Sequence, residues 1–439
     1  MLTTPQGTLE PSGLFSPIDL ASRPAVIAAV SGGSDSLALL LLLKSHFDRF
    51  SPPTRLVAAT VDHALRPESA AEAAAVARLC AGLGVPHRVL TWAGDKPKTG
   101  IAAAAREARH RLLAEAAAAE GTDLVLTGHT ANDQAETVLM RQARESLPDG
   151  GRGAAGMAQA TLFNGKTWLV RPLLGVRRNA LRDLLRQKRI AWIDDPTNAD
   201  QRYERPRVRK RLCEVDGEEA TAQALKDGAA AAGRRASSSE RAAGLIREHA
   251  RSPAPGLLRL RSDFFRAEHA EPAVLALRIL LAVAGGTPHL PDAARSEALF
   301  ARLAAGSPFR AVLSRTLIDR RKADAFLLRE ARGLPAVHEV RGGTVWDGRY
   351  CIVAPSLDAR REPPDMPARE SQECGTVAPE SLLRLAAAAQ PALPPQWSAV
   401  PVLAPWATYL PSFDIAVARA AAELIGAPPI TAPPFREHD

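Results

Sequence analysis

The sequence has few cysteines and no pair of them at the spacing of a metal site. Four cysteines occur among 439 residues, and no two of them form a C-x-x-C pair. We therefore do not expect a disulfide framework, a zinc ribbon or an iron–sulfur cluster held by this chain. We expect the four thiols to be reduced and structural; they belong to Cys80, Cys213, Cys351 and Cys374.

Long apolar runs are also lacking. The longest one, residues 37–43, is far shorter than the roughly 18 residues that cross a membrane. The first residues, MLTTPQGTLEPSG, contain neither a basic start nor the apolar core of a signal peptide. We therefore expect a cytoplasmic protein. Because 439 residues exceed the size of one hydrophobic core, we also expect two or three domains.

Two common nucleotide motifs are absent as well. A Walker loop, G-x-x-x-x-G-K-[ST], and a dinucleotide fingerprint, G-x-G-x-x-G, are both missing after the first strand-like run, PAVIAAV. SGGSDS stands there instead, at residues 31–36. Small residues before a helix let backbone N–H groups converge on an anion. A plain glycine turn would explain Gly32 and Gly33 but not the hydroxyls and the carboxylate beside them.

Positive charge is concentrated in one segment. The formal net charge is +8, and residues 171–211 hold thirteen Lys or Arg against five Asp or Glu, which equals the whole surplus. A charge block of this kind is often only a solvated face, but here it favours a polyanionic partner. Phosphate contacts are expected from Arg177, Arg178, Arg182, Arg186 and Lys188.

Strand-like apolar runs alternate with helical patterns between residues 24 and 192. This alternation predicts an α/β fold with a doubly wound parallel sheet. Right-handed crossovers would bring the loops after the strands to one edge of that sheet. The five expected strands are 24–30, 56–61, 87–92, 123–128 and 167–173. The four expected helices are 36–47, 69–84, 101–121 and 132–146.

The pattern changes beyond residue 213. An Ala-rich stretch from 214 to 249 predicts a helical connector with ASSSE as a candidate break, and the alternation around Asp347-Gly348 predicts a β-hairpin. Further helices are expected at 256–265, 272–286 and 294–306. We therefore divide the chain into an N-terminal extension, an α/β domain, a helical connector with a helical domain, and a β-containing, Pro-rich region. Their bounds are 1–23, 24–213, 214–330 and 331–439.

SGGSDS resembles the pyrophosphate-binding loop of the N-type ATP pyrophosphatases. The resemblance implies the adenine nucleotide alpha hydrolase-like fold, with a smaller α+β region after the helical linker. It also implies that Asp35 helps to hold Mg²⁺ and acts in catalysis. The departing pyrophosphate of ATP would be held by Ser31, Gly32, Gly33, Ser34, Asp35 and Ser36.

VDHALRPES, residues 61–69, is similar to the tRNA(Ile)-lysidine synthetases in particular. The resemblance implies that Val61, Asp62 and His63 form the adenine side of the nucleotide site. A cap at the end of the strand is the alternative for Asp62 and His63. The motif is more specific when it stands beside SGGSDS on a neighbouring strand.

GHTANDQAET, residues 128–137, stands where the fourth expected strand meets its helix. Its two carboxylates are three residues apart and share a helix face. The alternative, which can hold at the same time, is that Asn132 or Asp133 caps the helix and that Asp133 and Glu136 imitate a capping box. The pattern of the family is GH-x-x-DD-x-x-ET, from which Asn132 departs. The resemblance implies catalytic roles for His129, Asp133 and Glu136, with Asp133 also holding Mg²⁺ and Thr137 contacting substrate.

Three further stretches resemble the family. AAREARH places Arg106 and Arg109 on one helix face, where the resemblance implies contact with substrate and surface ion pairs are the alternative. His110 stands where the family has Tyr. GGRGAAGM, residues 150–157, matches a glycine-rich segment that would be a lid or a linker.

DDPTNADQRYERPRVR, residues 194–209, resembles the signature with which lysidine synthetases close their catalytic domain. The resemblance implies substrate contacts by Asp195, Asn198, Arg205 and Arg209. Pro206 replaces the usual Asn, which removes an N–H and an amide from that position.

The resemblance covers roughly residues 24–211 and implies one reaction. ATP would adenylate the C2 oxygen of the wobble cytidine in tRNA(Ile) with a CAU anticodon, and the ε-amino group of free L-lysine would displace AMP. Because the lysine ammonium has a pKa of about 10.4, a base must accept its proton, and we expect Asp133, Glu136 or His129, in that order. The alternatives are a tRNA thiolase, another synthetase of the superfamily, or a tRNA- or nucleotide-binding protein without turnover.

Overall fold

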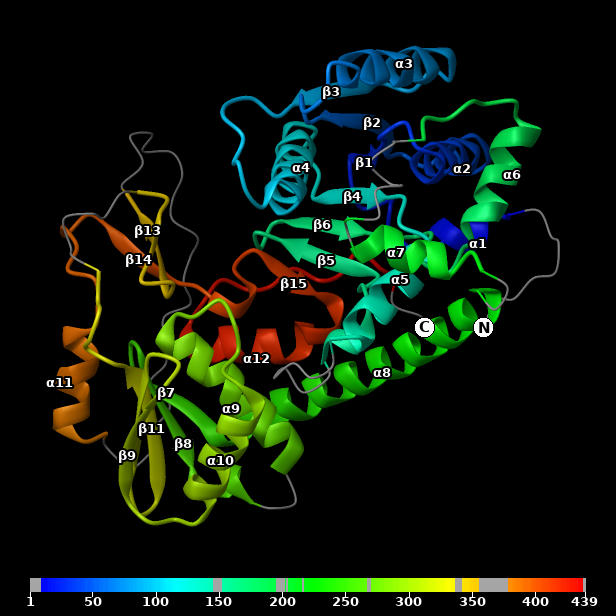
Figure 1. The fold of residues 1–439 in the computed structure, drawn as a ribbon. Helices are drawn as coiled ribbons and strands as arrows, with labels where there is room; N and C mark the ends of the chain where they lie inside the picture. Colours follow the sequence, from blue (N-terminus) through cyan, green and yellow to red (C-terminus); the bar gives the residue numbers. More distant parts are fainter. Residues whose placement is uncertain are drawn as a thin grey trace.

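A seven-stranded sheet forms the N-terminal part of the molecule (Figure 1). The computed structural model describes residues 9–144, 152–194, 202, 204–214, 217–266, 270–335, 342–354 and 378–436. Five strands are parallel, in the order β6-β4-β1-β2-β3, and they confirm the five strands expected from the sequence. They are β1 (Ala25–Ala29), β2 (Arg55–Asp62), β3 (His87–Thr91), β4 (Leu124–Thr127) and β6 (Thr167–Val170).

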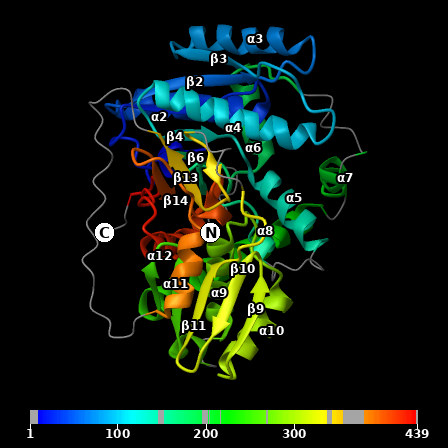
Figure 2. The same cartoon turned by 90° about the vertical axis from the view of Figure 1, so that its left-hand side faces the viewer.

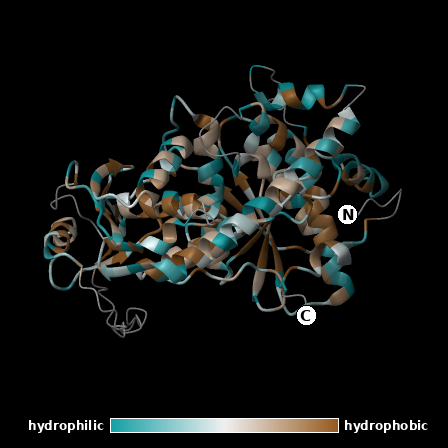
Figure 3. Cartoon of the chain, turned by 90° about the horizontal axis from the view of Figure 1, so that it is seen from below, coloured by the Kyte–Doolittle hydropathy of each residue, from teal (hydrophilic) through white to brown (hydrophobic). Residues whose placement is uncertain are grey.

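Helices cover both faces of this sheet, as a doubly wound fold requires. Val26 and Ala28 of β1 pack in one cluster with residues of α2, α3 and α6, while Ile27 packs on the other face with Leu113 of α4. The bounds of the helices are α1 (Pro11–Phe15), α2 (Ser34–Phe50), α3 (Ser69–Gly82), α4 (Ile101–Ala119), α5 (Ala131–Gln142), α6 (Arg178–Gln187) and α7 (Glu204–Arg211). Figure 3 shows the hydrophobic residues concentrated in the strands.

Two antiparallel strands at one edge of the sheet were not expected from the sequence. β5 (Ala160–Phe163) pairs with β6, and β15 (Tyr409–Pro411) pairs with β5. Each strand has only three or four residues, too few to show a strand period. Pro411 is tolerated because β15 is the edge strand.

One long helix connects the two ends of the molecule. α8 (Gly217–His249) runs unbroken through ASSSE, where a break was a candidate, so this expectation was wrong. Ser239 is fully buried and its hydroxyl accepts a hydrogen bond from the backbone N–H of Val417 at 3.2 Å. The serines therefore make tertiary contacts instead of ending the helix. α8 packs against α5, α9 and α12 (Ile415–Ile425), which Figure 1 shows along its length.

A five-stranded antiparallel sheet forms the second part of the molecule (Figure 2). Its order is β7-β8-β11-β10-β9. α9 (Ala270–Gly285) lies on one face and α11 (Glu380–Ala388) lies on the other, and α10 (Ala293–Ala304) packs on α9. The strands are β7 (Ala250–Ala254), β8 (Leu257–Arg261), β9 (Phe309–Leu313), β10 (Thr316–Arg320) and β11 (Asp324–Arg329).

The helix expected at 256–265 was wrong. This segment forms β8 and the 3₁₀ turn Ser262–Phe265. Leu257 and Leu258 pack on opposite faces of the sheet. Because both faces are buried, the strand lacks the alternation of apolar and polar residues that would have distinguished it from a helix.

The expected β-hairpin is confirmed. β12 (Val345–Trp346) and β13 (Tyr350–Val353) pair around Asp347 and Gly348, which have φ values of +52° and +71°. β14 (Ser398–Pro401) completes this small sheet. No helix in the described residues combines the length and the hydropathy needed to span a bilayer. The described cysteines, Cys80, Cys213 and Cys351, are unpaired, and Cys374 lies outside the described residues.

Candidate active site

The SGGSDS loop leaves the carboxyl end of β1 and starts α2. The backbone N–H of Ser31 and the backbone carbonyl of Gly33 both hydrogen-bond the hydroxyl of Ser36, at 3.1 and 3.0 Å. Gly32 has a φ of +84°, and a Cβ there would come within 2.9 Å of Cδ1 of Ile193. The loop is therefore closed by its own side chains, and glycine is required where residue 193 packs against it.

Two carboxylates from neighbouring strands converge on one arginine. Asp35 lies in the first turn of α2, after β1, and Asp133 lies in the first turn of α5, after β4. Nε of Arg178 is 2.8 Å from Oδ2 of Asp35, and its Nη2 is 3.0 Å from Oδ1 of Asp133. The strand order reverses between β1 and β4, and this crevice is where doubly wound sheets bind ligands.

Arg178 corrects one expectation from the sequence. We expected it to contact phosphates at a basic surface, but only 16% of its side chain is exposed and it pairs with Asp35, Asp133 and Glu136. Its backbone N–H donates to Oδ1 of Asn132 at 2.9 Å. The asparagine that departs from the family pattern thus helps to place the start of α6 beside the two carboxylates.

Glu136 is held by two more arginines from α7. Nε of Arg205 is 2.6 Å from Oε2 of Glu136, and Nε of Arg209 is 2.7 Å from its Oε1. Arg205 also reaches Oδ1 of Asp133 at 3.0 Å. Pro206 lies in the first turn of α7, where a backbone N–H has no partner within the helix, so its lack of a donor is tolerated. Asp195 and Asn198 lie outside the described residues.

Asp133 serves the helix and the site at once. Its Oδ2 accepts from the backbone N–H of Thr130 at 2.9 Å in a capping box, while its Oδ1 faces the arginines. Burial would raise the pKa of Asp133, but Arg178 and Arg205 outweigh it and hold the pKa at about 2. Burial raises the pKa of Asp35, and Arg178 offsets only part of this effect. The hydroxyl of Thr137 donates to the backbone carbonyl of Asp133 at 2.7 Å and not into the site.

His129 is an uncharged neighbour of these groups at neutral pH. Burial lowers its pKa to about 3, and the Arg171 charge contributes next. Its Nδ1 is 2.9 Å from the hydroxyl of Thr127. The imidazole therefore stands close to Asp133 as a neutral hydrogen-bonding group.

The residues expected on the adenine side lie at the end of β2. Oδ1 of Asp62 accepts from the backbone N–H of Ala64 at 2.8 Å, so Asp62 does cap the strand, as the alternative proposed. Val61 belongs to β2 beside it. The ring of His63 stands edge-on to Trp92, and Nη2 of Arg109 is 3.3 Å from its Nε2. Burial lowers the pKa of His63 to about 4, and Arg109 adds to this effect.

The described part of the glycine-rich segment is anchored. The side chain of Gln134 donates to the carbonyl of Met157 at 3.2 Å and accepts from its N–H at 2.8 Å. Arg152, in the 3₁₀ turn Arg152–Ala155, pairs with the buried Asp414 at 2.6 Å. Asp414 comes from the C-terminal region, which the sequence did not connect with this segment.

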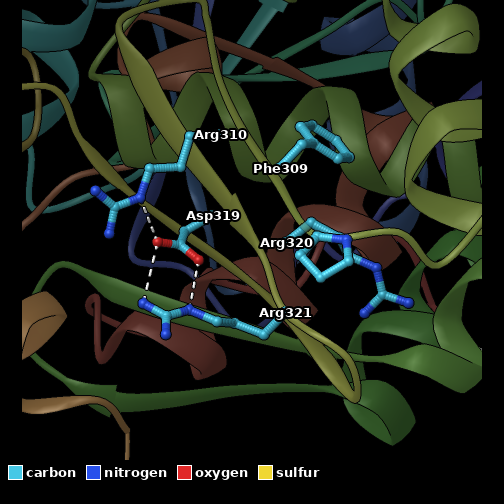
Figure 4. A pocket seen from close by; sticks show the side chains of 6 residues that line it. Phe309, Arg310, Asp319, Arg320 and Arg321 are labelled. Carbon is cyan, nitrogen blue, oxygen red and sulfur yellow. Dashed lines mark hydrogen bonds and ion pairs between the residues drawn. The ribbon is translucent and has the colours of Figure 1, made fainter.

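A second arginine-rich hollow lies on the C-terminal sheet (Figure 4). It has a volume of about 380 Å³. Asp319 at its centre is 2.7 Å from Nε of Arg310 and 2.6 Å from Nε of Arg321. Its lining contains one carboxylate, that of Asp319, and none of the sequence motifs described above. The edge of the N-terminal sheet, which carries the motifs and several carboxylates, is therefore the better candidate for the active site.

The chain is similar to a known domain family and to two curated proteins. Residues 12–215 match the model of the PP-loop domain family. The chain is 51% identical over 447 residues to the tRNA(Ile)-lysidine synthase of Mesorhizobium japonicum, with 97% of each chain covered. It is 43% identical over 356 residues to that of Brucella ovis, with 78% of this chain and 77% of the relative covered.

A solved structure is also similar over part of the chain. It is the U34-tRNA thiolase NcsA from Methanococcus maripaludis with its [4Fe-4S] cluster, at 15% identity and a TM-score of 0.41 over 50% of this chain and 77% of that one. The identity to the two curated relatives is much higher and extends over most or nearly all of the chain. The chain therefore belongs to the tRNA(Ile)-lysidine synthase family, with a PP-loop domain of the adenine nucleotide alpha hydrolase-like fold at its N-terminal end.

Proposed function

We propose that this chain uses ATP to join free L-lysine to C2 of the wobble cytidine of tRNA(Ile) with a CAU anticodon. The cytidine would first be adenylated at its C2 oxygen, and the lysine ε-amine would then displace AMP to leave lysidine. One observation carries the proposal: Asp35 and Asp133 both bind Arg178 beside the SGGSDS loop, where the strand order reverses between β1 and β4.

The SGGSDS loop and the N-terminus of α2 suit the pyrophosphate of ATP. Their backbone N–H groups and the helix dipole favour an anion, and Ser31, Ser34 and Ser36 add hydroxyls. Val61, Asp62 and His63 would line the adenine. Preorganised donors of this kind stabilise charge that develops on the leaving group.

The carboxylates of Asp35 and Asp133 fit Mg²⁺. Both offer hard oxygen donors, and both already face one cationic group, the guanidinium of Arg178. Mg²⁺ is commonly held by one or two carboxylates together with substrate phosphates. No group of three or more metal-ligating side chains occurs among the described residues, which agrees with so small a donor set. When bound, Mg²⁺ would neutralise charge on the phosphate oxygens.

Asp133 is our first choice for the base that takes the proton of the lysine amine. Its Oδ1 now contacts Arg178 and Arg205, and its pKa of about 2 makes it a weak base in this arrangement. We propose that these arginines turn to the phosphates of ATP and free Oδ1, the oxygen that Thr130 does not occupy, for the magnesium site and for the amine in turn. Glu136, which Arg205 and Arg209 hold at both oxygens, and His129 are the second and third choices.

The basic face of α6 would contact tRNA phosphates. Arg186 and Lys188 are exposed, and Arg182 stands near the hydroxyl of Ser34 at 3.4 Å. Arg177 pairs with Glu218 at 2.9 Å. These contacts would position the tRNA without reading its sequence.

Pyrophosphate release tests this proposal. Purified protein is incubated with ATP, Mg²⁺ and a transcript of tRNA(Ile) with a CAU anticodon, with and without L-lysine, and the nucleosides are analysed by mass. We expect pyrophosphate that depends on the tRNA, and a cytidine heavier by one lysine less water. The same transcript with a GAU anticodon is the control.

Three outcomes would contradict the proposal. A mass change of the size of one sulfur would indicate a thiolase, and pyrophosphate released without tRNA would indicate another synthetase. Binding of tRNA and ATP without any release would indicate a binding protein.

A further inference from the structure

Arg171 is a buried arginine without a counter-charge. It follows β6 at the carboxyl edge of the sheet and is 4% exposed. No described carboxylate lies within 4.0 Å of its guanidinium. A buried cation without an anion is costly, so proteins pair such groups.

Among the described residues, the side-chain hydrogen bonds of Arg171 are made by one nitrogen of the guanidinium, Nη1. Nη1 donates to the backbone carbonyl of Ala158 at 2.8 Å, to the hydroxyl of Thr161 at 3.0 Å and to the carbonyl of Leu169 at 3.5 Å. Nε is buried and has no partner in the described part of the chain. Neutral donors would satisfy these three acceptors equally well, so packing does not account for the charge.

The surroundings of Arg171 are positive. Burial lowers the pKa of Arg171 to about 10, and the charge of Arg106 adds to this effect. Arg106 and Arg205 also contribute to the low pKa of His129, so these cations lie near the same imidazole. Arg106 is exposed on α4. The group that would balance this site is an anion.

The order of the strands indicates which anion would bind at Arg171. In the order β6-β4-β1-β2, the phosphate loop follows β1 and the adenine side follows β2, so ATP extends away from β6. Neighbouring strands lie about 4.8 Å apart. His129 and Asp133 follow β4 and therefore stand between ATP and Arg171. An amine that attacks next to ATP would come from the side of β6.

We propose that Arg171, with Arg106 beside it, binds the α-carboxylate of the free amino acid and directs its side-chain amine toward Asp133. This inference rests on the proposed function and adds a binding residue to it. Nε and the neighbouring Nη2 form the edge of a guanidinium that binds a carboxylate through two parallel hydrogen bonds. The site would thus select an amino acid over a simple diamine.

The test compares L-lysine with two amines that lack its carboxylate, L-lysinamide and 1,5-diaminopentane. Each is assayed for kcat/KM with wild-type protein, Arg171→Met and Arg106→Ala. We expect Arg171→Met to lower kcat/KM for lysine by about 10- to 100-fold, the value of a charged hydrogen bond. The ratio of kcat/KM for lysine to kcat/KM for lysinamide should therefore fall by about this factor.

Arg320→Met is the matched control. Arg320 is also 4% exposed and also has an unpartnered guanidinium nitrogen, but it lies in the C-terminal sheet. We expect its preference for lysine over lysinamide to equal that of the wild type. If Arg171→Met fails to fold, two other variants test the same preference for lysine over lysinamide. They are Arg106→Ala and Arg171→Lys, and the lysine keeps the charge but loses the paired donors.

Two results would overturn the inference. Equal losses of kcat/KM for lysine and lysinamide would mean that Arg171 does not bind the carboxylate. Weaker tRNA binding with a flatter salt dependence would assign the site to a phosphate of the tRNA.

Calorimetry separates this inference from the proposed function. Lysine and lysinamide are titrated into protein with ATP, in the wild type and in Arg171→Met. If the wild type binds lysine more tightly than lysinamide and Arg171→Met does not, the inference is supported. A lack of pyrophosphate release in the same protein would refute only the proposed function. Equal binding of the two ligands overturns it.

Discussion

Two clusters of this molecule surround an aspartate with arginines, and they differ in how closed they are. Asp133 at the N-terminal sheet faces Arg178 and Arg205, and 12% of the side chain of Asp133 is exposed. Asp347 in the β12-β13 turn faces Arg315, Arg329 and Arg349, and its own side chain is fully buried. The two clusters use the same chemistry in different surroundings.

The arginines around Asp347 are occupied on other sides as well. Nη2 of Arg329 donates to the carbonyl of Gly333 at 3.2 Å, and Arg349 donates to the carbonyl of Ala389. This cluster fixes a hairpin to the five-stranded sheet, and two of its three arginines, Arg329 and Arg349, have buried side chains. In the proposed function, phosphates of ATP would replace carboxylates as the partners of the arginines around Asp133. We therefore expect exchangeable partners at the reactive cluster and fixed partners at the structural cluster.

The largest expected effect is on turnover at the open cluster. Asp133→Asn keeps the capping oxygen but removes the charge, so we expect AMP formation with tRNA and lysine to fall about 1,000-fold or more. Asp35→Asn should have a similar effect. Filter binding of the tRNA should stay within a few-fold of wild type. A parallel loss of tRNA affinity would place these carboxylates in tRNA binding instead.

At the closed cluster we expect the reverse. Asp347→Asn leaves three arginines without their counter-charge, so the free energy of unfolding should fall by about 3–5 kcal/mol, measured in urea. Turnover per folded molecule should be unchanged. Lys44→Met, which breaks only the exposed pair with Asp48, is the control and should cost less than about 1 kcal/mol. If folded Asp347→Asn lost turnover, the cluster around Asp347 would also act in the reaction, and the proposed difference between the two clusters would be wrong.

His110 is a buried side chain that is neutral in the folded protein, unlike the charged aspartates of the two clusters, and it extends the comparison to the effect of pH on stability. Burial lowers the pKa of His110 to about 3, and its Nδ1 is 3.0 Å from the hydroxyl of Tyr409. Above the unfolded pKa of about 6.5 both states are neutral. As the pH falls from 6.5 toward 3, only the unfolded state binds the proton, so stability is lost by up to about 1.4 kcal/mol per pH unit.

The variant His110→Gln checks this, because glutamine can keep the hydrogen bond but does not titrate. We expect its free energy of unfolding to fall less steeply than that of the wild type between pH 6.5 and 4.5. Identical pH profiles would mean that His110 is protonated in the folded protein.

The smallest effect is expected on the outer face of α6. Arg186 is exposed, whereas Arg178 on the same helix is turned into the site. Arg186→Gln should lower the slope of log K against log salt for tRNA binding by about one unit. Pyrophosphate release at saturating tRNA should not change. An unchanged slope would show that this face does not contact the tRNA.

The sequence predicted the parallel sheet well because each strand and helix there has its own local pattern. It failed where tertiary contacts decide the structure. β15 has three residues and belongs to a sheet whose other strands end at Val170. The break expected in α8 did not occur because Ser239 is engaged by α12.

The candidate site was also predicted only in part, because some of its side chains are placed by tertiary contacts. SGGSDS and GHTANDQAET indicated Asp35, Asp133 and Glu136, and the structure brings all three to Arg178. The burial of Arg178 and Arg171 could not be predicted, because composition counts a buried arginine and a surface arginine alike. Their burial depends on how α6 and β6 pack, which no local pattern records.

The return of the chain to its first sheet has a consequence for biosynthesis. Tyr409 of β15 pairs beside β5, and Phe435 forms a bridge with Ile18 near the start of the chain. These contacts form last during translation, because a domain folds as its residues leave the ribosome. A nascent chain that stops before residue 409 lacks the partner of His110 and the anchor of Arg152. Incomplete products would thus carry the SGGSDS loop in a sheet that lacks its edge strand.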